Sequence, residues 1–374
     1  MPSSSKEDGT AAAAQQLGSM SLGGSAVERN DEDNDAGEPT AKNGATPTTK
    51  KLCSACGKKS DTLKKCNGCK CAWYCDKKCQ NKHRKEHKRE CRPIKEVLDK
   101  RGGRLVVGTE KDLGPLGKVP PREECPICMR ALPIHARLHV YAACCGKFIC
   151  GGCNFQYQIK STEVNAKRGQ REPPLPLLPR LCAFCRTAAP PSNEELLVQL
   201  RKRVELKDPN ALYNMAVEYG NGQLGLSVDQ AKCIDLMRQS SGLGCTEAQL
   251  KLGSFYDSGM MGLEQNEEEA FKYEKKAAEG GQLNALYNVG CFEAKNGDLV
   301  AAMRHWRLAA SGGYKNSMQG LIAFYFENGL IHHGDLAETL QAMYLARGEM
   351  RSEDRDQYIK HLKMTGEYRE EYEH

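Results

Sequence analysis

The cysteines are the residues whose spacing points most directly to chemistry. Sixteen of the 19 cysteines lie between Cys53 and Cys185, most of them two or three residues from another. Two thiolates of a Cys-x-x-Cys turn can bind the same tetrahedral zinc ion, although disulfides are the alternative. The chain shows no signal peptide and no apolar run long enough to cross a membrane. We therefore expect a reducing compartment, cytoplasm or nucleus, and zinc in place of disulfides.

The first cysteine-rich segment, residues 53–91, carries eight potential metal donors. They are Cys53, Cys56, Cys66, Cys69, Cys75, Cys79, His87 and Cys91. About forty residues cannot bury a sufficient core of their own. Each structural zinc ion would add roughly 10 to 16 kcal/mol to folding. Cys71 and His83 lie beside these donors and could replace one of them, but we interpret both as spectators.

With Trp73 and Tyr74 before Cys75, the whole segment resembles a MYND finger. The resemblance implies two interleaved zinc sites, the first of Cys53, Cys56, Cys75 and Cys79 and the second of Cys66, Cys69, His87 and Cys91. It also implies a groove that accepts proline-containing peptides of partner proteins. Arg84 stands where the family usually has a tryptophan, so the usual peptide preference is not expected to carry over unchanged.

The second cysteine-rich segment, residues 122–190, carries eight thiols in an order that resembles a RING finger. The resemblance implies one site of Cys125, Cys128, Cys150 and Cys153 and another of Cys144, Cys145, Cys182 and Cys185. Lys147 stands where RING fingers usually have a histidine ligand. A protonated lysine has no lone pair to donate, so we expect Cys144 to replace it.

A RING finger has no catalytic nucleophile and acts by holding a ubiquitin-conjugating enzyme. By this resemblance Ile127 would contact that enzyme and Arg186 would contact ubiquitin, while Ala183 replaces a usual proline. An ordinary packing role for Ile127 and a solvated charge for Arg186 are equally open.

From residue 192 onward the sequence predicts paired helices that repeat. Ala211, Ala248 and Ala285 recur 37 residues apart, and Met318 opens a fourth copy. Small residues five positions later should let helices approach closely: Ala216, Gly253, Gly290 and Ala323. Asp229, Asn266, Asp298 and Asp335 suit helix N-caps. Gly244, Gly281 and Gly313 suit the position of positive φ after a helix. The pattern predicts a mainly α fold, an α/α solenoid.

The small-residue pattern and the run from Ala277 to Gly281 resemble SEL-one-like repeats over residues 208–350, a class that generally binds proteins. Ser192 and Glu195 predict a capping helix over 192–206. We expect the charged helical tail 351–374 to pack on the fourth copy. Residues 1–50 predict a disordered tail, and 92–121 a linker with a helical start.

Charge is segregated along the chain. Residues 51–104 carry a net +12 and the remainder −6. Lysines near zinc thiolates offset negative charge, so we favour that explanation over nucleic-acid binding. The stretch PPLPLLP at 173–179 predicts a linker, with occupation of a MYND groove as the alternative.

The sequence thus predicts a zinc-binding protein-interaction adaptor with four zinc ions per chain. A RING-type ubiquitin-protein ligase that recruits substrates through the repeats is the alternative. A nucleic-acid-binding regulator is the weaker one. No motif indicates a conventional catalytic pocket.

Overall fold

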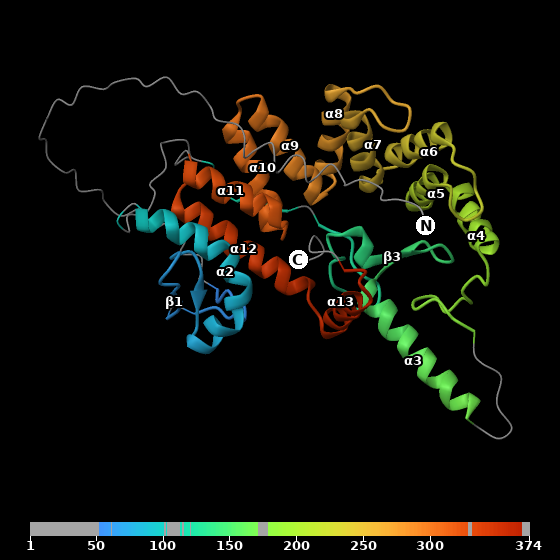
Figure 1. Cartoon of the computed structure of the whole chain (residues 1–374), viewed down its shortest axis with the longest axis horizontal. Helices are drawn as coiled ribbons and strands as arrows, with labels where there is room; N and C mark the ends of the chain where they lie inside the picture. The colour runs from blue at the N-terminus through green and yellow to red at the C-terminus, as the bar shows by residue number, and fades with distance from the viewer. Residues whose placement is uncertain are drawn as a thin grey trace, which may run out of the picture.

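The computed structural model describes residues 52–60, 62–100, 102, 113, 116–119, 121–170, 179–327 and 331–368. The predicted tail 1–50 and nearly all of the proline-rich stretch 173–179 lie outside these residues. Within them the fold is mainly helical, with stacked helix pairs that follow two small cysteine-rich modules (Figure 1). This confirms the predicted fold class. None of the described helices has the length and apolar character that crossing a membrane requires.

The repeat region consists of four consecutive helix pairs. They are α5 (Pro209–Asn221) with α6 (Gln230–Gly242), α7 (Thr246–Ser258) with α8 (Glu267–Glu279), α9 (Leu283–Lys295) with α10 (Leu299–Ser311), and α11 (Lys315–Glu327) with α12 (His333–Met350). α4 (Asn193–Glu205) precedes them, and its N-cap Ser192 accepts a hydrogen bond from the backbone N–H of Glu195. The pairs follow one another in a curved row (Figure 1).

The repeated small residues lie where helices approach most closely. Ala211, Ala248 and Ala285 are fully buried. A Cβ at Gly290 would lie 2.6 Å from Trp306 Nε1, and one at Gly253 would lie 2.7 Å from Glu274 Cγ. These distances confirm that close packing requires glycine at both positions. Ala323 is exposed, so the fourth copy departs from this rule.

Three of the four predicted N-caps are present. Asp229, Asn266 and Asp298 each accept a hydrogen bond from the backbone N–H three residues on. Gly244, Gly281 and Gly313 have φ of 89°, 88° and 105°, as predicted for the residue after a helix. The prediction for Asp335 is wrong, because α12 begins at His333. Its carboxylate instead pairs with Arg307, at 3.3 Å from Nη2.

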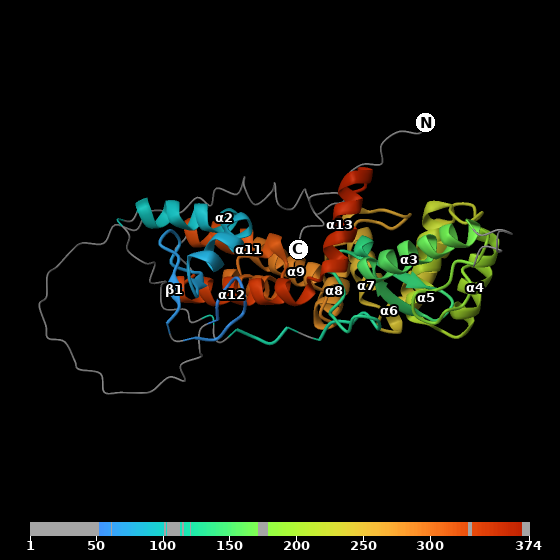
Figure 2. The ribbon, with the colours of Figure 1, turned by 90° about the horizontal axis from the view of Figure 1, so that it is seen from below.

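The first module consists of the strands β1 (Lys64–Lys65) and β2 (Trp73–Tyr74), which pair antiparallel, and α2 (Lys77–Lys100). α2 continues nine residues beyond Cys91, and Ile94, Val97 and Leu98 on this extension are buried. They lie in the same apolar core as side chains of α10, α11 and α12. The helical start of the predicted linker is therefore part of a packed core, and the module lies beside α11 and α12 (Figures 1 and 2).

The second module contains a 3-10 turn η1 (Ala136–Leu138), the antiparallel strands β3 (His139–Ala142) and β4 (Lys147–Cys150), and α3 (Gly151–Gly169). The tail helix α13 (Glu353–Thr365) packs against α3 instead of joining the fourth repeat as we expected. A Cβ at Gly152 would lie 2.7 Å from Arg355 N. Glycine at the start of α3 thus leaves the space that the α13 backbone occupies.

Trp306 of α10 is the largest fully buried side chain of the repeats. Its Nε1–H donates to the Tyr287 carbonyl oxygen at 3.1 Å. We expect Trp306→Ala to lower the free energy of unfolding by about 3 to 5 kcal/mol, because it leaves a cavity and an unpaired carbonyl group. Urea denaturation followed by circular dichroism measures this loss. Trp306→Phe should cost less, and equal losses for the two variants would contradict a cavity effect.

Candidate metal centres

The first group of donors joins the N-terminal turn of the first module to the end of β2 and the start of α2. Cys53 and Cys56 belong to a turn closed by the bridge between Leu52 and Lys59. Cys75 follows β2, and Cys79 lies in the first turn of α2. The Cys56 and Cys75 sulfur atoms are 3.7 Å apart. The structure brings all four predicted cysteines together, with donor atoms within 4.8 Å of one another.

The second group lies between the strands and α2. Cys66 and Cys69 precede β2, while His87 and Cys91 lie four residues apart on one face of α2. The Cys66 and Cys91 sulfur atoms are 3.8 Å apart, and Cys69 Sγ is 3.4 Å from His87 Nε2. Helical spacing of four residues is what turns the last two donors toward one ion.

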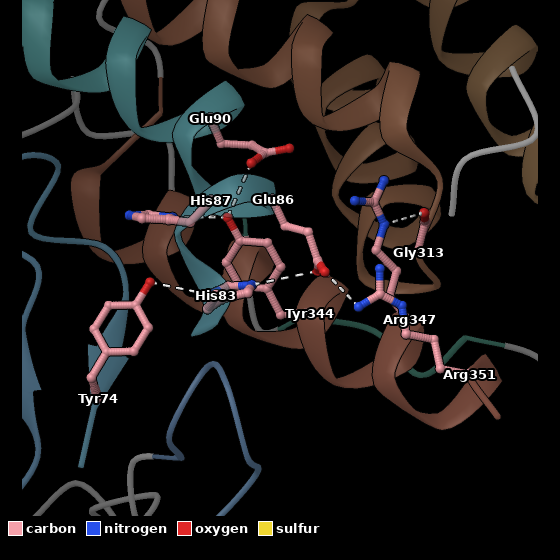
Figure 3. Close-up of polar contacts among 9 residues, drawn as sticks. All are labelled: Tyr74, His83, Glu86, His87, Glu90, Gly313, Tyr344, Arg347 and Arg351. Atoms are coloured by element: carbon pink, nitrogen blue, oxygen red, sulfur yellow. Dashed lines mark hydrogen bonds and ion pairs between the residues drawn. The ribbon is translucent and has the colours of Figure 1, made fainter. Parts of the chain in front are cut away.

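Tyr344 of α12 is a further functional residue at this group, which sequence reasoning missed. Its hydroxyl is 2.9 Å from His87 Nδ1 and donates to Glu90 Oε2 at 3.1 Å (Figure 3). With Nε2 directed at the metal position, Nδ1–H donates to Tyr344, which fixes the ring orientation and tautomer. Burial raises the pKa of Tyr344 well above its ordinary value, so the hydroxyl keeps its proton. No local sequence signal links residues 257 positions apart.

The second module contains the other two groups. Cys125 and Cys128 lie with Cys150 at the end of β4 and Cys153 in the first turn of α3, and the Cys128 and Cys150 sulfur atoms are 3.9 Å apart. The last group joins the β3–β4 turn to the final turn of the module. It consists of Cys144, Cys145, Cys182 and Cys185, and the Cys185 and Cys144 sulfur atoms are 3.4 Å apart.

All four groups fit a tetrahedral zinc ion. A zinc–sulfur bond of about 2.3 Å places two sulfur ligands about 3.8 Å apart, close to the separations observed. A disulfide would require about 2.05 Å, and every described cysteine is free. Backbone N–H groups also point at sulfur, with Cys150 N 3.4 Å from Cys125 Sγ. Each group is therefore compatible with one zinc ion.

Cationic side chains of the helical region contact the second module at its cysteines. Arg355 of α13 donates to the Ala131 carbonyl oxygen at 2.8 Å, and its Nη2 is 3.5 Å from Cys128 Sγ. Arg203 of α4 donates to the Cys144 carbonyl oxygen at 3.0 Å. Arginines distant in sequence thus supply positive charge at the second module.

Cys71 and His83 lie outside the four groups. Cys71 is fully buried, and its sulfur is 3.4 Å from His333 Nε2 of α12. His83 Nδ1 is 3.1 Å from the Tyr74 hydroxyl. Burial lowers the pKa of His83 to about 4, so its ring is neutral at pH 7. Both side chains pack at the boundary between the first module and α12.

Cys144 and Lys147 allow a direct test of the donor set in the second module. Cys144 belongs to the last group, whereas a protonated Lys147 has no lone pair to donate to a metal ion. We expect Cys144→Ser to retain one zinc ion fewer than the wild type, and Lys147→Ala to retain the full number. Native mass spectrometry counts the ions. Equal zinc content in Cys144→Ser and wild type would contradict an all-cysteine site.

The two predicted partner-binding residues lie on the surface of the second module. The Ile127 side chain is 41% exposed. Arg186 is also exposed, and its guanidinium group lies 4.5 Å from the Tyr157 ring centroid. Sequence reasoning missed Met129 and Phe184, which are 69% and 41% exposed. The sequence signal that could have found them is an apolar residue within or directly after a Cys-x-x-Cys turn.

Comparisons with known proteins identify two parts of the chain. A MYND finger model matches residues 53–91. A Sel1 repeat model matches 209–245, 246–282 and 283–314, and also 11–33, which the structure does not describe. Neither range includes the second module. Comparison with curated proteins gave no match.

Two solved structures have partial similarity to the chain. A Sel1 repeat protein from Oxalobacter formigenes is 26% identical, with a TM-score of 0.32 and coverage of 34% of this chain and 97% of that one. The protective antigen c5321 of uropathogenic Escherichia coli, which displays an SLR fold, is 16% identical with a TM-score of 0.36. It covers 57% of this chain, and the match spans 46% of its own length. On the family models, the chain contains a MYND zinc finger and Sel1 repeats.

Proposed function

We propose that the protein is an adaptor that binds other proteins and holds four structural zinc ions through the sixteen predicted ligands. MYND fingers and Sel1 repeats are protein-interaction modules, which supports this role. The reducing conditions of the cytoplasm or nucleus would keep the thiols available for zinc. Zinc supplies no reaction here, because four protein donors leave no open position for a substrate.

The observation that carries the proposal is the set of exposed apolar side chains on the second module. Ile127, Met129 and Phe184 remain exposed although the module buries Leu132, Ile149 and its inner cysteines. All three exposed residues belong to cysteine turns, which metal binding would hold rigid. Exposed apolar groups on a rigid surface are typical of a site that binds a partner protein.

Comparative affinity capture tests this surface. Ile127→Ser with Phe184→Ser should remove a defined set of proteins that wild type retains, while zinc content and helical content stay unchanged. Val198→Ser is the matched control, because Val198 of α4 is 47% exposed on another surface. Identical captured sets for all three proteins would refute the assignment of this surface.

A RING-type ubiquitin-protein ligase is the second candidate. It is favoured by the interleaving of the two cysteine groups, in which Cys125 and Cys128 join Cys150 and Cys153 across the intervening pair. The exposed positions of Ile127 and Arg186 also agree with the contacts that a RING resemblance implies.

Discharge of ubiquitin from a panel of conjugating enzymes decides between the two candidates. A ligase should accelerate discharge, and Ile127→Ala and Arg186→Ala should each slow it with zinc content unchanged. Ala183 is only 5% exposed and packs in the module core, so Ala183→Pro is a poor probe and Phe184→Ser a better one. Absence of discharge with every enzyme would leave the adaptor function alone.

A further inference from the structure

A cavity of about 240 Å³ lies where the two cysteine modules meet the end of the repeats. Its walls come from α2, from residues of the second module, from the start of α11, and from α12 and α13. Each of these five segments contributes lining residues, for example, in the same order, Lys85, Gly152, Lys315, Arg347 and Tyr358. The cavity therefore exists only when these five segments are assembled.

The cavity walls are strongly cationic. Seven lysine and arginine residues line it, against three acidic residues. Two of the acidic side chains already have partners, as Figure 3 shows. Glu86 pairs with Arg351 at 2.5 Å, and Glu90 accepts the hydrogen bond of the Tyr344 hydroxyl at 3.1 Å. The excess of lysine and arginine side chains over acidic ones in the lining favours an anion in the cavity.

Arg347 supplies an unsatisfied hydrogen-bond donor at this position. Arg347 is 7% exposed, and its Nε–H donates to the Gly313 carbonyl oxygen at 3.1 Å (Figure 3). Its Nη2 has no hydrogen-bond partner within the part of the chain that the structure describes. A buried donor left unpaired costs about 1 to 3 kcal/mol, and a bound anion would recover this energy.

The rest of the cavity is apolar. Leu138 of the second module, Met350 of α12 and Tyr358 and Ile359 of α13 line it. A bare inorganic anion would leave this surface without a partner. A ligand that joins an aromatic or aliphatic body to a dianionic group uses both kinds of wall, because a phosphate accepts several charge-assisted hydrogen bonds at once.

We propose that this cavity binds an aryl phosphate monoester, with the phosphate against Lys85, Lys315 and Arg347 and the ring against the apolar wall. The same chemistry can come from a free small molecule or from a phosphotyrosine side chain. Either source would connect the first module, the second module and the repeats. Binding should therefore stabilise their assembly as well as fill the cavity.

Isothermal titration of the zinc-loaded full chain with phenyl phosphate tests the proposal. Lys85→Met and Lys315→Met should each weaken binding by about fivefold, since each removes one charge from the phosphate position. Lys82→Met is the matched control, because Lys82 is exposed on the same helix as Lys85 and does not line the cavity. Arg347→Met should weaken binding by more than about tenfold. If Arg347→Met folds poorly, the two lysine variants still test the proposal.

Further probes separate the sources and the contribution of the ring. A blocked phosphotyrosine peptide that binds more tightly than phenyl phosphate would support a protein source, and weaker binding a small-molecule source. Inorganic phosphate should bind more weakly than both. The proposal is overturned if no probe binds, if Lys85→Met and Lys315→Met bind like the wild type, or if inorganic phosphate binds as tightly as phenyl phosphate.

Discussion

Removal of zinc by a chelator should unfold the first module and loosen the last repeat with it, while the first repeats stay folded. One apolar core contains Cys53, Cys66 and Cys69 of the first module together with Trp306 of α10 and Leu336 of α12. Each structural zinc ion contributes roughly 10 to 16 kcal/mol to the free energy of folding. A module of this size cannot stay folded without that contribution. The helices α5, α6 and α7 lie in a separate core that, among the described residues, contains no side chain of the first module and, from the second module, only Ala143 with Tyr141 packed against it. Loss of these two side chains should leave that core folded.

Hydrogen exchange measured by mass spectrometry resolves this effect along the chain. Amides of residues 62–100 and 331–350 should lose protection, and those of 209–258 should keep it. The same chelator saturated with zinc is the control. Equal loss of protection in α5 and α2 would contradict a division of the chain into separately stabilised cores.

Cys69→Ser should remove one zinc ion and unfold the first module, whereas Cys71→Ser should retain all four ions. The two cysteines are two residues apart and both fully buried, but only Cys69 belongs to a donor group. The loss for Cys69→Ser is on the order of 10 kcal/mol because it removes a zinc-binding thiolate. Cys71→Ser should cost only about 1 to 3 kcal/mol for a buried hydroxyl.

Native mass spectrometry and thermal unfolding measure the two variants together. Equal zinc content would show that a donor other than Cys69 completes the site. Loss of an ion in Cys71→Ser alone would reverse the roles of the two residues.

The sequence determined the repeat architecture and the partition of the cysteines to a large extent. Ala211, Ala248 and Ala285 recur because each copy of the repeat needs a small side chain at a buried position between its helices. This requirement is local to the copy. The glycines after three of the helices recur for a local reason too, because the chain has a positive φ there; they are Gly244, Gly281 and Gly313. The resemblance to MYND and RING fingers implied the four groups of side chains that the structure brings together. Local spacing accounts for the pairs within each group, because short turns and one face of α2 hold the two members of a pair together.

Tertiary structure alone decided how the modules meet. Tyr344 reaches His87, Arg355 reaches Cys128, and α13 lies on α3. Asp335 matched the capping pattern, yet α12 begins earlier and Arg307 takes its carboxylate. Such contacts depend on which surfaces remain uncovered once every element has formed, and local propensity carries no information about them. The cavity lined by Lys85, Arg347 and Tyr358 belongs to this class, because its walls meet only in the assembled chain.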